Sequence, residues 1–349
     1  MQIDQINDFV VLFLGVVWEA LPFIVLGALI AGTLEELLPQ DAIAKILPRH
    51  FLPAILLGGL LGLVFPMCEC GIVVVMRRLL KKGLPLSCCV SYMLAGPIVN
   101  VVVIMSTWYA FEKHKVGIEQ TQSLAPLMVG LRCGMGFLVA CVTGVVVHFV
   151  EKRSKTPLTT MITRPTPVSL GLAGEAPAPR PTIMQRINNI TSTAVHDFMD
   201  ITVFLIIGSI LASLIKTNPV LFRSVQDLSQ QQPVVAILAM MGLAVLLCLC
   251  SEADAFLAAS FSGMSVSARL SFLVLGPMLD LKLLLMYTRV FRPKLIAVLV
   301  TCTVLQVAVY SIALHYAYNP YVPGSPQAKS ETPQANTQPS DATPSTSGR

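Results

Sequence analysis

The chain has 349 residues, of which 54% are hydrophobic and 12% are charged, and its mean hydropathy is +0.73. No soluble domain of this length needs so much apolar surface, so the composition excludes the ordinary soluble classes. The net charge is +5, and the Lys and Arg residues gather at the ends of apolar segments. This distribution is typical of membrane proteins. The composition therefore predicts a protein whose partner is the lipid bilayer and not a nucleic acid.

Eight apolar segments follow one another along the chain, four in each half, and each approaches the length needed to cross the bilayer core as a helix. The first half contains the segments 9–34, 51–76, 84–111 and 124–150. The second half contains 198–215, 233–250, 270–288 and 295–318. We therefore predict an all-α polytopic membrane protein with about eight transmembrane helices, multi-pass in the bacterial cytoplasmic membrane.

Two stretches of different composition divide the chain. Residues 151–186 hold six prolines and six Lys or Arg residues, which predicts a cytoplasmic linker with little fixed structure. Residues 319–349 are rich in Pro, Ser, Thr and Gln and predict a disordered tail. We expect a first four-helix membrane repeat over 1–150 and a second over 187–318.

The two halves share a duplicated segment. Residues 68–100 align with residues 248–280 without a gap, and seven of the 33 aligned positions are identical. The identities fall on cysteine, glycine, serine and proline, whereas chance matches would favour the common apolar residues. Duplicated segments with broken helices are typical of transporter repeats. Four spans in each half would make the repeats parallel, whereas re-entrant Cys-x-Cys segments would leave three spans and make them inverted. The sequence leaves both arrangements open.

Each copy of the duplicated segment begins with two cysteines, Cys68 and Cys70 or Cys248 and Cys250. Thiols at this spacing converge on one atom only where the backbone is not a regular helix, and Pro66 supplies such a break in the first copy. Soft thiolates suit zinc, copper(I) and, by the same logic, trivalent arsenic, although no particular metal is indicated. The alternative is that these cysteines are small apolar residues that fill the core.

Charged residues also occur in or beside the apolar segments, where they face an interior or a cavity in membrane proteins. We expect Arg132 and Lys282 to neutralise some of the acids. Glu69 and Glu252 are candidates for a proton relay because they lie at the breaks. The complete set is Glu19, Glu69, Arg132, Asp200, Glu252, Asp254, Asp280 and Lys282.

A Gly-Pro step followed by a polar residue completes both copies of the segment. Gly96 and Pro97 precede Asn100, and Gly276 and Pro277 precede Asp280. Proline kinks a helix and frees carbonyl groups, so the polar residue can face the opening. We therefore predict a central substrate site that the two copies share. Its candidate residues are Cys68, Glu69, Cys70, Asn100, Cys248, Cys250, Glu252, Asp254 and Asp280.

The sequence contains no phosphate-binding loop of the form G-x-x-x-x-G-K-[ST] and no His-Glu-x-x-His motif, so we expect neither an enzyme nor a bound cofactor. A membrane thiol oxidoreductase that uses the Cys-x-Cys pairs remains an alternative. A non-transporting subunit of a membrane complex is another.

Basic residues predict the topology through the positive-inside rule. They cluster at residues 77–82 and 152–155, which places these loops and, with four spans in each half, the N-terminus in the cytoplasm. Arg289, Arg292 and Lys294 do not fit this arrangement, because they would lie outside.

Three stretches, residues 68–72, 77–87 and 94–100, resemble the bacterial predicted-permease family that includes the organoarsenical permease ArsP. Residues 248–259 and 275–280 look like that family too, and the resemblance covers about residues 9–318. It implies an eight-helix permease, and the arsenical member implies efflux of trivalent organoarsenicals with thiols as ligands. We therefore expect a secondary transporter that exports a small thiophilic or metalloid solute, and a partner subunit in the membrane is conceivable. The alternative is a permease for an unrelated solute or metal ion, with structural cysteines.

Overall fold

The computed structural model describes residues 3–37, 50–65, 67–112, 115–116, 122–154, 158–159, 183–216, 233–261 and 264–318. Nearly all of these residues are helical, and within the described ranges the only strands are β1 (Lys115–Val116) and β2 (Gln122–Ser123), which pair with each other. The prediction of an all-α polytopic membrane protein is confirmed.

The helices of the two halves follow the same order. The first half contains α1 (Ile3–Leu37), α3 (Phe51–Val64), α4 (Glu69–Lys81), α5 (Leu86–Ala95), α6 (Val101–Glu112) and α7 (Ala125–Arg153). The second half contains α8 (Ile183–Lys216), α10 (Pro233–Leu247), α11 (Ser251–Ser260), α12 (Val266–Met278), α13 (Leu281–Val290) and α14 (Pro293–Tyr318).

Four helical segments of the described chain are long and apolar enough to cross a bilayer. Three of the four carry exposed large apolar side chains, and Trp18 on α1 is 81% exposed, whereas Val266–Val290 is mostly buried inside the molecule. In water such a surface would be unfavourable, whereas lipid tails solvate it. The four segments are Phe9–Thr33, Ala125–Arg153, Val266–Val290 and Pro293–Ala317.

Several of the apolar segments are interrupted near the middle of the molecule. Segment 51–76 divides into α3 and α4, and segment 84–111 divides into α5 and α6. The equivalent breaks of the second half separate α10 from α11 and α12 from α13. Gly96 is the C-cap residue of α5, and Pro97 lies in the turn after it. Pro277 lies inside α12, and the break follows at Leu279 and Asp280. Pro66 lies outside the described residues.

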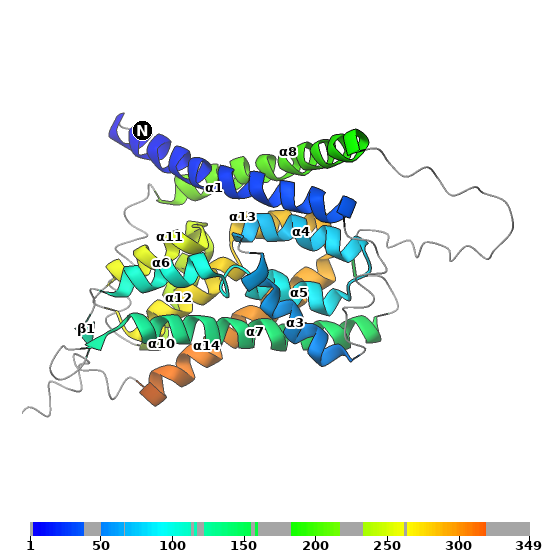
Figure 1. Ribbon diagram of the computed structural model, residues 1–349. Helices are drawn as coiled ribbons and strands as arrows, with labels where there is room; N and C mark the ends of the chain where they lie inside the picture. Colours follow the sequence, from blue (N-terminus) through cyan, green and yellow to red (C-terminus); the bar gives the residue numbers. More distant parts are fainter. Residues whose placement is uncertain are drawn as a thin grey trace, which may run out of the picture.

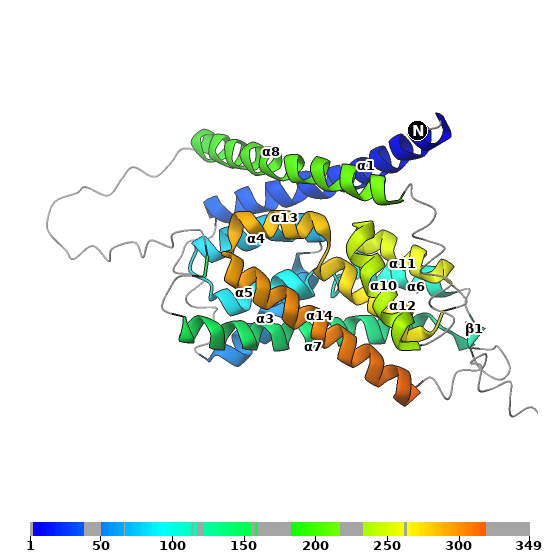
Figure 2. The same ribbon diagram turned by 180° about the vertical axis from the view of Figure 1, so that it is seen from behind.

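The two halves run in opposite directions. Helices α1 and α8 pack side by side, and Gly32 near the end of α1 meets Ile190 near the start of α8, where an added Cβ would lie 2.9 Å from the Ile190 carbonyl oxygen. The end of α7 lies beside the start of α14, because the Arg292 N–H donates to the Leu158 carbonyl oxygen at 3.0 Å. Both pairs are therefore antiparallel, as Figures 1 and 2 show.

The Cys-x-Cys segments enter the molecule and return to the side from which they came. Helices α3, α4 and α5 lie in the half from which the linker emerges, and α10, α11 and α12 lie in the opposite half (Figures 1 and 2). Helix α13 crosses to pack on α4, and α6 crosses to pack on α11. Of the two arrangements compatible with the sequence, the structure has the inverted one.

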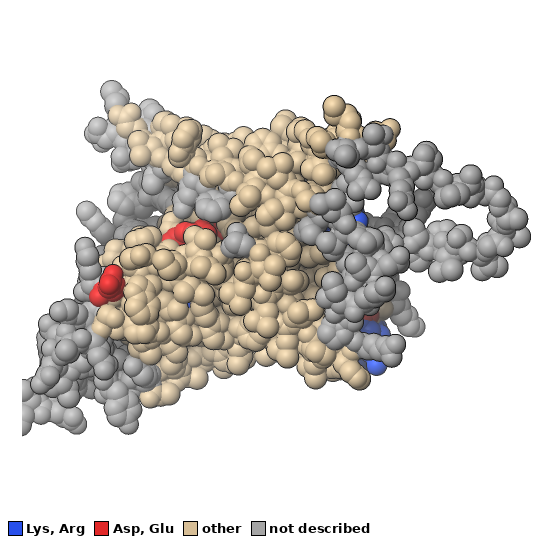
Figure 3. Space-filling model, viewed as in Figure 1, with Lys and Arg blue, Asp and Glu red and all other residues tan. Residues whose placement is uncertain are grey.

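This arrangement corrects the expected position of the N-terminus. Helix α1 crosses the molecule once, and its N-terminal end lies opposite the linker in Figure 1. The turn between α13 and α14 lies at the linker end, since Thr159 and Phe291 form a β-bridge. Arg289, Arg292 and Lys294 therefore share one side with the linker. The basic atoms visible in Figure 3 also lie at that end. The expectation was wrong because it counted the re-entrant segment as a crossing.

Candidate functional site at the broken helices

The breaks place the starts of four short helices, α4, α6, α11 and α13, in the interior. Their N-cap residues are Cys68, Cys250 and Asp280 for three of them, and Asn100 directly precedes α6. Asn100 Oδ1 accepts from the Val102 N–H at 2.9 Å, and Asp280 Oδ1 accepts from the Leu283 N–H at 2.6 Å. The side chains at these two aligned positions therefore have the same role, since each accepts a hydrogen bond from a backbone N–H at the start of the next helix. Helix N-termini at membrane depth carry partial positive charge and favour anionic groups.

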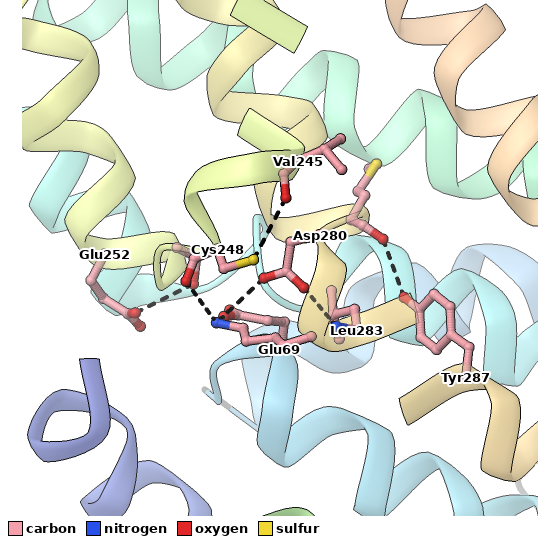
Figure 4. A network of polar contacts seen from close by, with 10 residues as sticks. Glu69, Val245, Cys248, Glu252, Asp280, Leu283 and Tyr287 are labelled. Atoms are coloured by element: carbon pink, nitrogen blue, oxygen red, sulfur yellow. Dashed lines mark hydrogen bonds and ion pairs between the residues drawn. The ribbon is translucent and has the colours of Figure 1, made fainter. Parts of the chain in front are cut away.

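A buried ion pair joins the two halves at this point. Lys282 of α13 donates to Glu69 Oε1 of α4 at 2.7 Å, and its Nζ lies 3.4 Å from Asp280 Oδ2 (Figure 4). These three side chains are about 1% exposed. The same ammonium group donates to the Cys248 carbonyl oxygen at 3.4 Å. Removing one partner from such a buried pair leaves an uncompensated charge, so the contact fixes α13 on α4.

A second buried cation, Arg132 of α7, lies on the other side of the site. Its Nη1 donates to Thr107 Oγ1 of α6 at 2.7 Å, and its Nη2 donates to the Ser251 carbonyl oxygen at 2.8 Å. Arg132 is attracted to Asp254 of α11 more strongly than to any other acid, but no direct ion pair joins them in the described structure. Arg132 therefore ties the break before α11 to two helices of the first half.

Asp254 is buried in the interior against α12. An added Cβ at Gly276 would lie 2.7 Å from Asp254 Oδ2, so glycine is required for this approach. Asp254 Oδ2 accepts no hydrogen bond. Glu252, on the same helix, is only partly buried, and Ser251 Oγ donates to its Oε2 at 3.3 Å. Figure 3 shows acidic atoms at the surface where α11 lies in Figure 1.

The four predicted thiols do not share one environment. Cys68 lies beside Cys70 and within electrostatic range of Cys250, and both Cys70 and Cys250 lie near Lys282. Cys248 adopts a φ of 48°, and its Sγ lies 3.6 Å from the Val245 carbonyl oxygen. All nine cysteines are free thiols. Within the part of the chain that the structure describes, no three His, Cys, Asp or Glu side chains are arranged to hold a metal ion.

The predicted site residues lie at or near the breaks, but the predicted site did not include Arg132, Lys282 and Thr107, whose side chains make hydrogen bonds or ion pairs there. Arg132 and Lys282 were expected only to neutralise acids, yet they make the main contacts between the halves. Thr107 was not singled out, because a lone threonine in an apolar helix gives no signal. Asn100 is buried, and its Nδ2 donates to the Met67 carbonyl oxygen at 3.3 Å. The side chains of Glu19 and Asp200 lie outside the described part of the structure.

Comparison with known proteins agrees with this architecture. Residues 5–316 match the model of a family described as a predicted permease, of the ArsP type. The chain belongs to this predicted permease family. It is therefore a multi-pass membrane permease, and the match covers both halves and every break.

Two similar proteins cover nearly the same length as this permease. The chain is 33% identical over 313 residues to the Bacillus subtilis (strain 168) protein named "UPF0718 protein YcgR", covering 88% of this chain and 96% of that protein. It is 32% identical over 304 residues to a Streptococcus mutans serotype c (strain ATCC 700610 / UA159) protein named "Putative two-component membrane permease complex subunit", covering 86% and 93%. No solved structure matches the chain.

Proposed function

We propose that this permease exports a small thiophilic solute, such as a trivalent organoarsenical, through the space between its four interior helix starts. The observation that carries the proposal is the ion pair between Glu69 and Lys282, which lie 213 positions apart, one in each half of the chain. Transporters with inverted repeats bind their solutes where such broken helices meet near the bilayer centre. Alternating access then requires the two halves to move about this point.

The thiols support the proposed class of solute. Cys68 and Cys70 are buried at the start of α4, and Cys250 is buried at the start of α11. Trivalent arsenic is soft and prefers sulfur, and in a monomethyl arsenical two thiolates can replace the two oxygen ligands while the As–C bond stays intact. The family's arsenical member transports such solutes, and this chain carries the Cys68-Glu69-Cys70 motif of the family.

Transport of methylarsenite into everted membrane vesicles tests the proposal. We expect vesicles with the native permease to accumulate the arsenical, and the triple variant Cys68→Ser, Cys70→Ser, Cys250→Ser to lose accumulation. Serine keeps the shape but supplies no soft ligand. Cys141→Ser on α7 is the matched control, because Cys141 lies away from the breaks, and it should transport normally.

Retained transport by the triple variant would contradict the role of the thiols and favour an unrelated solute with structural cysteines. No accumulation by the native permease would remove arsenicals from the substrate class. A membrane thiol oxidoreductase predicts instead that Cys68 and Cys70 cycle between dithiol and disulfide, which thiol trapping in native membranes would detect.

We further propose that a second membrane subunit can assemble with this chain. The support is the name of the Streptococcus mutans relative, which describes a two-component permease complex. Repeating the accumulation assay with the purified chain in lipid vesicles shows whether the chain transports alone or needs a second subunit. Transport by the purified chain alone would show that no second subunit is needed.

A further inference from the structure

The interior cluster has one more acid than it has cations. Three carboxyl groups and two cationic groups are buried there, each with 2% exposure or less: Glu69, Asp254, Asp280, Arg132 and Lys282. If all five were ionised, the cluster would carry a net charge of −1. An uncompensated charge at membrane depth is strongly unfavourable. One added proton removes this excess.

The contacts indicate which carboxyl group holds that proton. Lys282 is bonded to Glu69 and lies beside Asp280, so both of these acids have a direct cationic partner. The hydrogen bonds of Arg132 go to a hydroxyl and to a carbonyl oxygen, and neither reaches Asp254. Asp254 is therefore the one member of the three that lacks a direct ion pair in the described structure, while one oxygen of each of the three acids accepts no hydrogen bond from the described residues.

The groups packed around Asp254 also favour its neutral form. The charged residues that face it are Arg132 from α7, Glu69 from α4, and Asp280 and Lys282 from the start of α13. Glu252 lies on the same helix as Asp254, and Gly276 of α12 packs against Asp254. Thr107 of α6 accepts a hydrogen bond from Arg132. Burial and two acids oppose ionisation, while Arg132 and the more distant Lys282 favour it. A buried carboxylate without a hydrogen bond to one oxygen is costly, whereas a carboxylic acid is tolerated.

We propose that Asp254 is the proton-binding site of this permease and that it carries one proton in the present conformation. Protonation forms one O–H bond on the carboxylate and changes no oxidation state. With Asp254 neutral, the two remaining acids balance the two cations. When the halves move, Asp254 of the second half becomes exposed to water and releases the proton, which couples solute movement to a proton gradient. This coupling rests on the proposed transport function, but the protonation of Asp254 does not.

A sodium ion fits the same place poorly. Sodium sites at broken helices gather several carbonyl and carboxylate oxygens around the ion. Gly276 of α12 lies beside Asp254 Oδ2 and brings no side chain, and among the described residues no group of three His, Cys, Asp or Glu side chains could hold a metal ion. A proton needs only the one carboxyl oxygen.

Infrared difference spectroscopy of the purified full-length permease in lipid vesicles tests the protonation without any solute. A carboxylic acid has a carbonyl stretching band that a carboxylate lacks. We expect this band at neutral pH, where ordinary aspartates are ionised. Incorporating aspartate labelled with carbon-13 at its carboxyl carbon should shift the band. The band should disappear in Asp254→Asn and persist in Glu112→Gln, an exposed control on α6.

Several outcomes would overturn the proposal. A band that persists in Asp254→Asn, or that the aspartate label does not shift, assigns the proton to another group. If Asp254→Asn fails to fold, the carbon-13 label in the native chain still tests the proposal, because a band that the label does not shift would place the proton on a group other than an aspartate. A shift of the band with sodium concentration at constant pH would favour sodium. A labelled band without arsenical transport would reject the proposed solute and leave the proton site in place.

Discussion

At the scale of single residues, buried charged and polar side chains of this permease supply the hydrogen bonds that water would otherwise make to polar groups in the interior. Lys282 contacts Glu69, Asp280 and the Cys248 carbonyl oxygen. Its ammonium group therefore balances the charge of the carboxylates and donates a hydrogen bond to a backbone carbonyl oxygen at the break before α11. Tyr287, one turn later, donates to the Met278 carbonyl oxygen at 3.1 Å, which α12 leaves free where it ends. Broken helices persist in the membrane interior only where such partners exist.

We expect Lys282→Ala to destabilise the protein by about 3–5 kcal/mol, because Glu69 and Asp280 would stay buried without their cation. Thermal unfolding of the purified protein in lipid nanodiscs measures this effect. The control Lys294→Ala removes an exposed cation at the start of α14 and should change stability by less than about 0.5 kcal/mol. Adding Glu69→Gln to Lys282→Ala should recover part of the loss, and the absence of any recovery would show that the two residues are not coupled.

At the scale of helices, small residues let the elements approach one another closely. An added Cβ at Gly27 of α1 would lie 2.8 Å from the Gly71 Cα of α4, and one at Gly208 of α8 would lie 2.7 Å from the Lys282 Cβ of α13. The two glycines therefore mark where the α1–α8 pair rests on the helices of the site. Such contacts replace the hydrophobic driving force, which is absent between helices in lipid.

Gly27→Ala should weaken the packing of α1 on α4 by about 1–3 kcal/mol, because both colliding atoms belong to backbone and cannot turn away. Gly15→Ala on the same helix is the matched control, since an added Cβ there meets nothing within 4 Å. It should be neutral or stabilise by up to about 1 kcal/mol through helix propensity. Equal thermal shifts for the two variants would argue against the close contact between α1 and α4.

At the scale of the whole molecule, the inverted arrangement determines which ends of the helices share a side of the membrane. The linker, the end of α4 and the turn between α13 and α14 lie at one end, and the N-terminus and the end of α14 lie at the other (Figures 1 and 2). The basic clusters at residues 77–82 and 289–294 then fall on the same side as the linker. The positive-inside rule makes that side cytoplasmic.

Labelling of introduced cysteines in intact cells checks this topology. An impermeant maleimide should label Asn7→Cys, which lies at the exposed start of α1, and should not label Lys294→Cys at the start of α14. Both signals are compared with the parent chain and its nine buried or partly buried cysteines. Labelling of Lys294→Cys alone would reverse the orientation, and equal labelling of both would contradict the antiparallel arrangement.

The sequence by itself determined the class of the protein and the positions of its special residues. Uncharged segments of bilayer length left no soluble alternative, and the gap-free match of residues 68–100 with 248–280 marked both copies of the broken motif. Such features are local, because hydrophobic length and helix-breaking residues act on the chain before it folds. The family match over residues 5–316 agrees with them.

Only the tertiary structure decided the direction of the repeats and the partners of the charges. A break at Cys248 to Cys250 is compatible with a span or with a hairpin, and the packing of α11 on α6 selects the hairpin. The pairing of Lys282 with Glu69, and the isolation of Asp254 from a direct cation, likewise depend on helices distant in sequence. Sequence spacing places side chains along one helix, whereas which charges meet depends on how helices from different halves cross, and no local pattern encodes that.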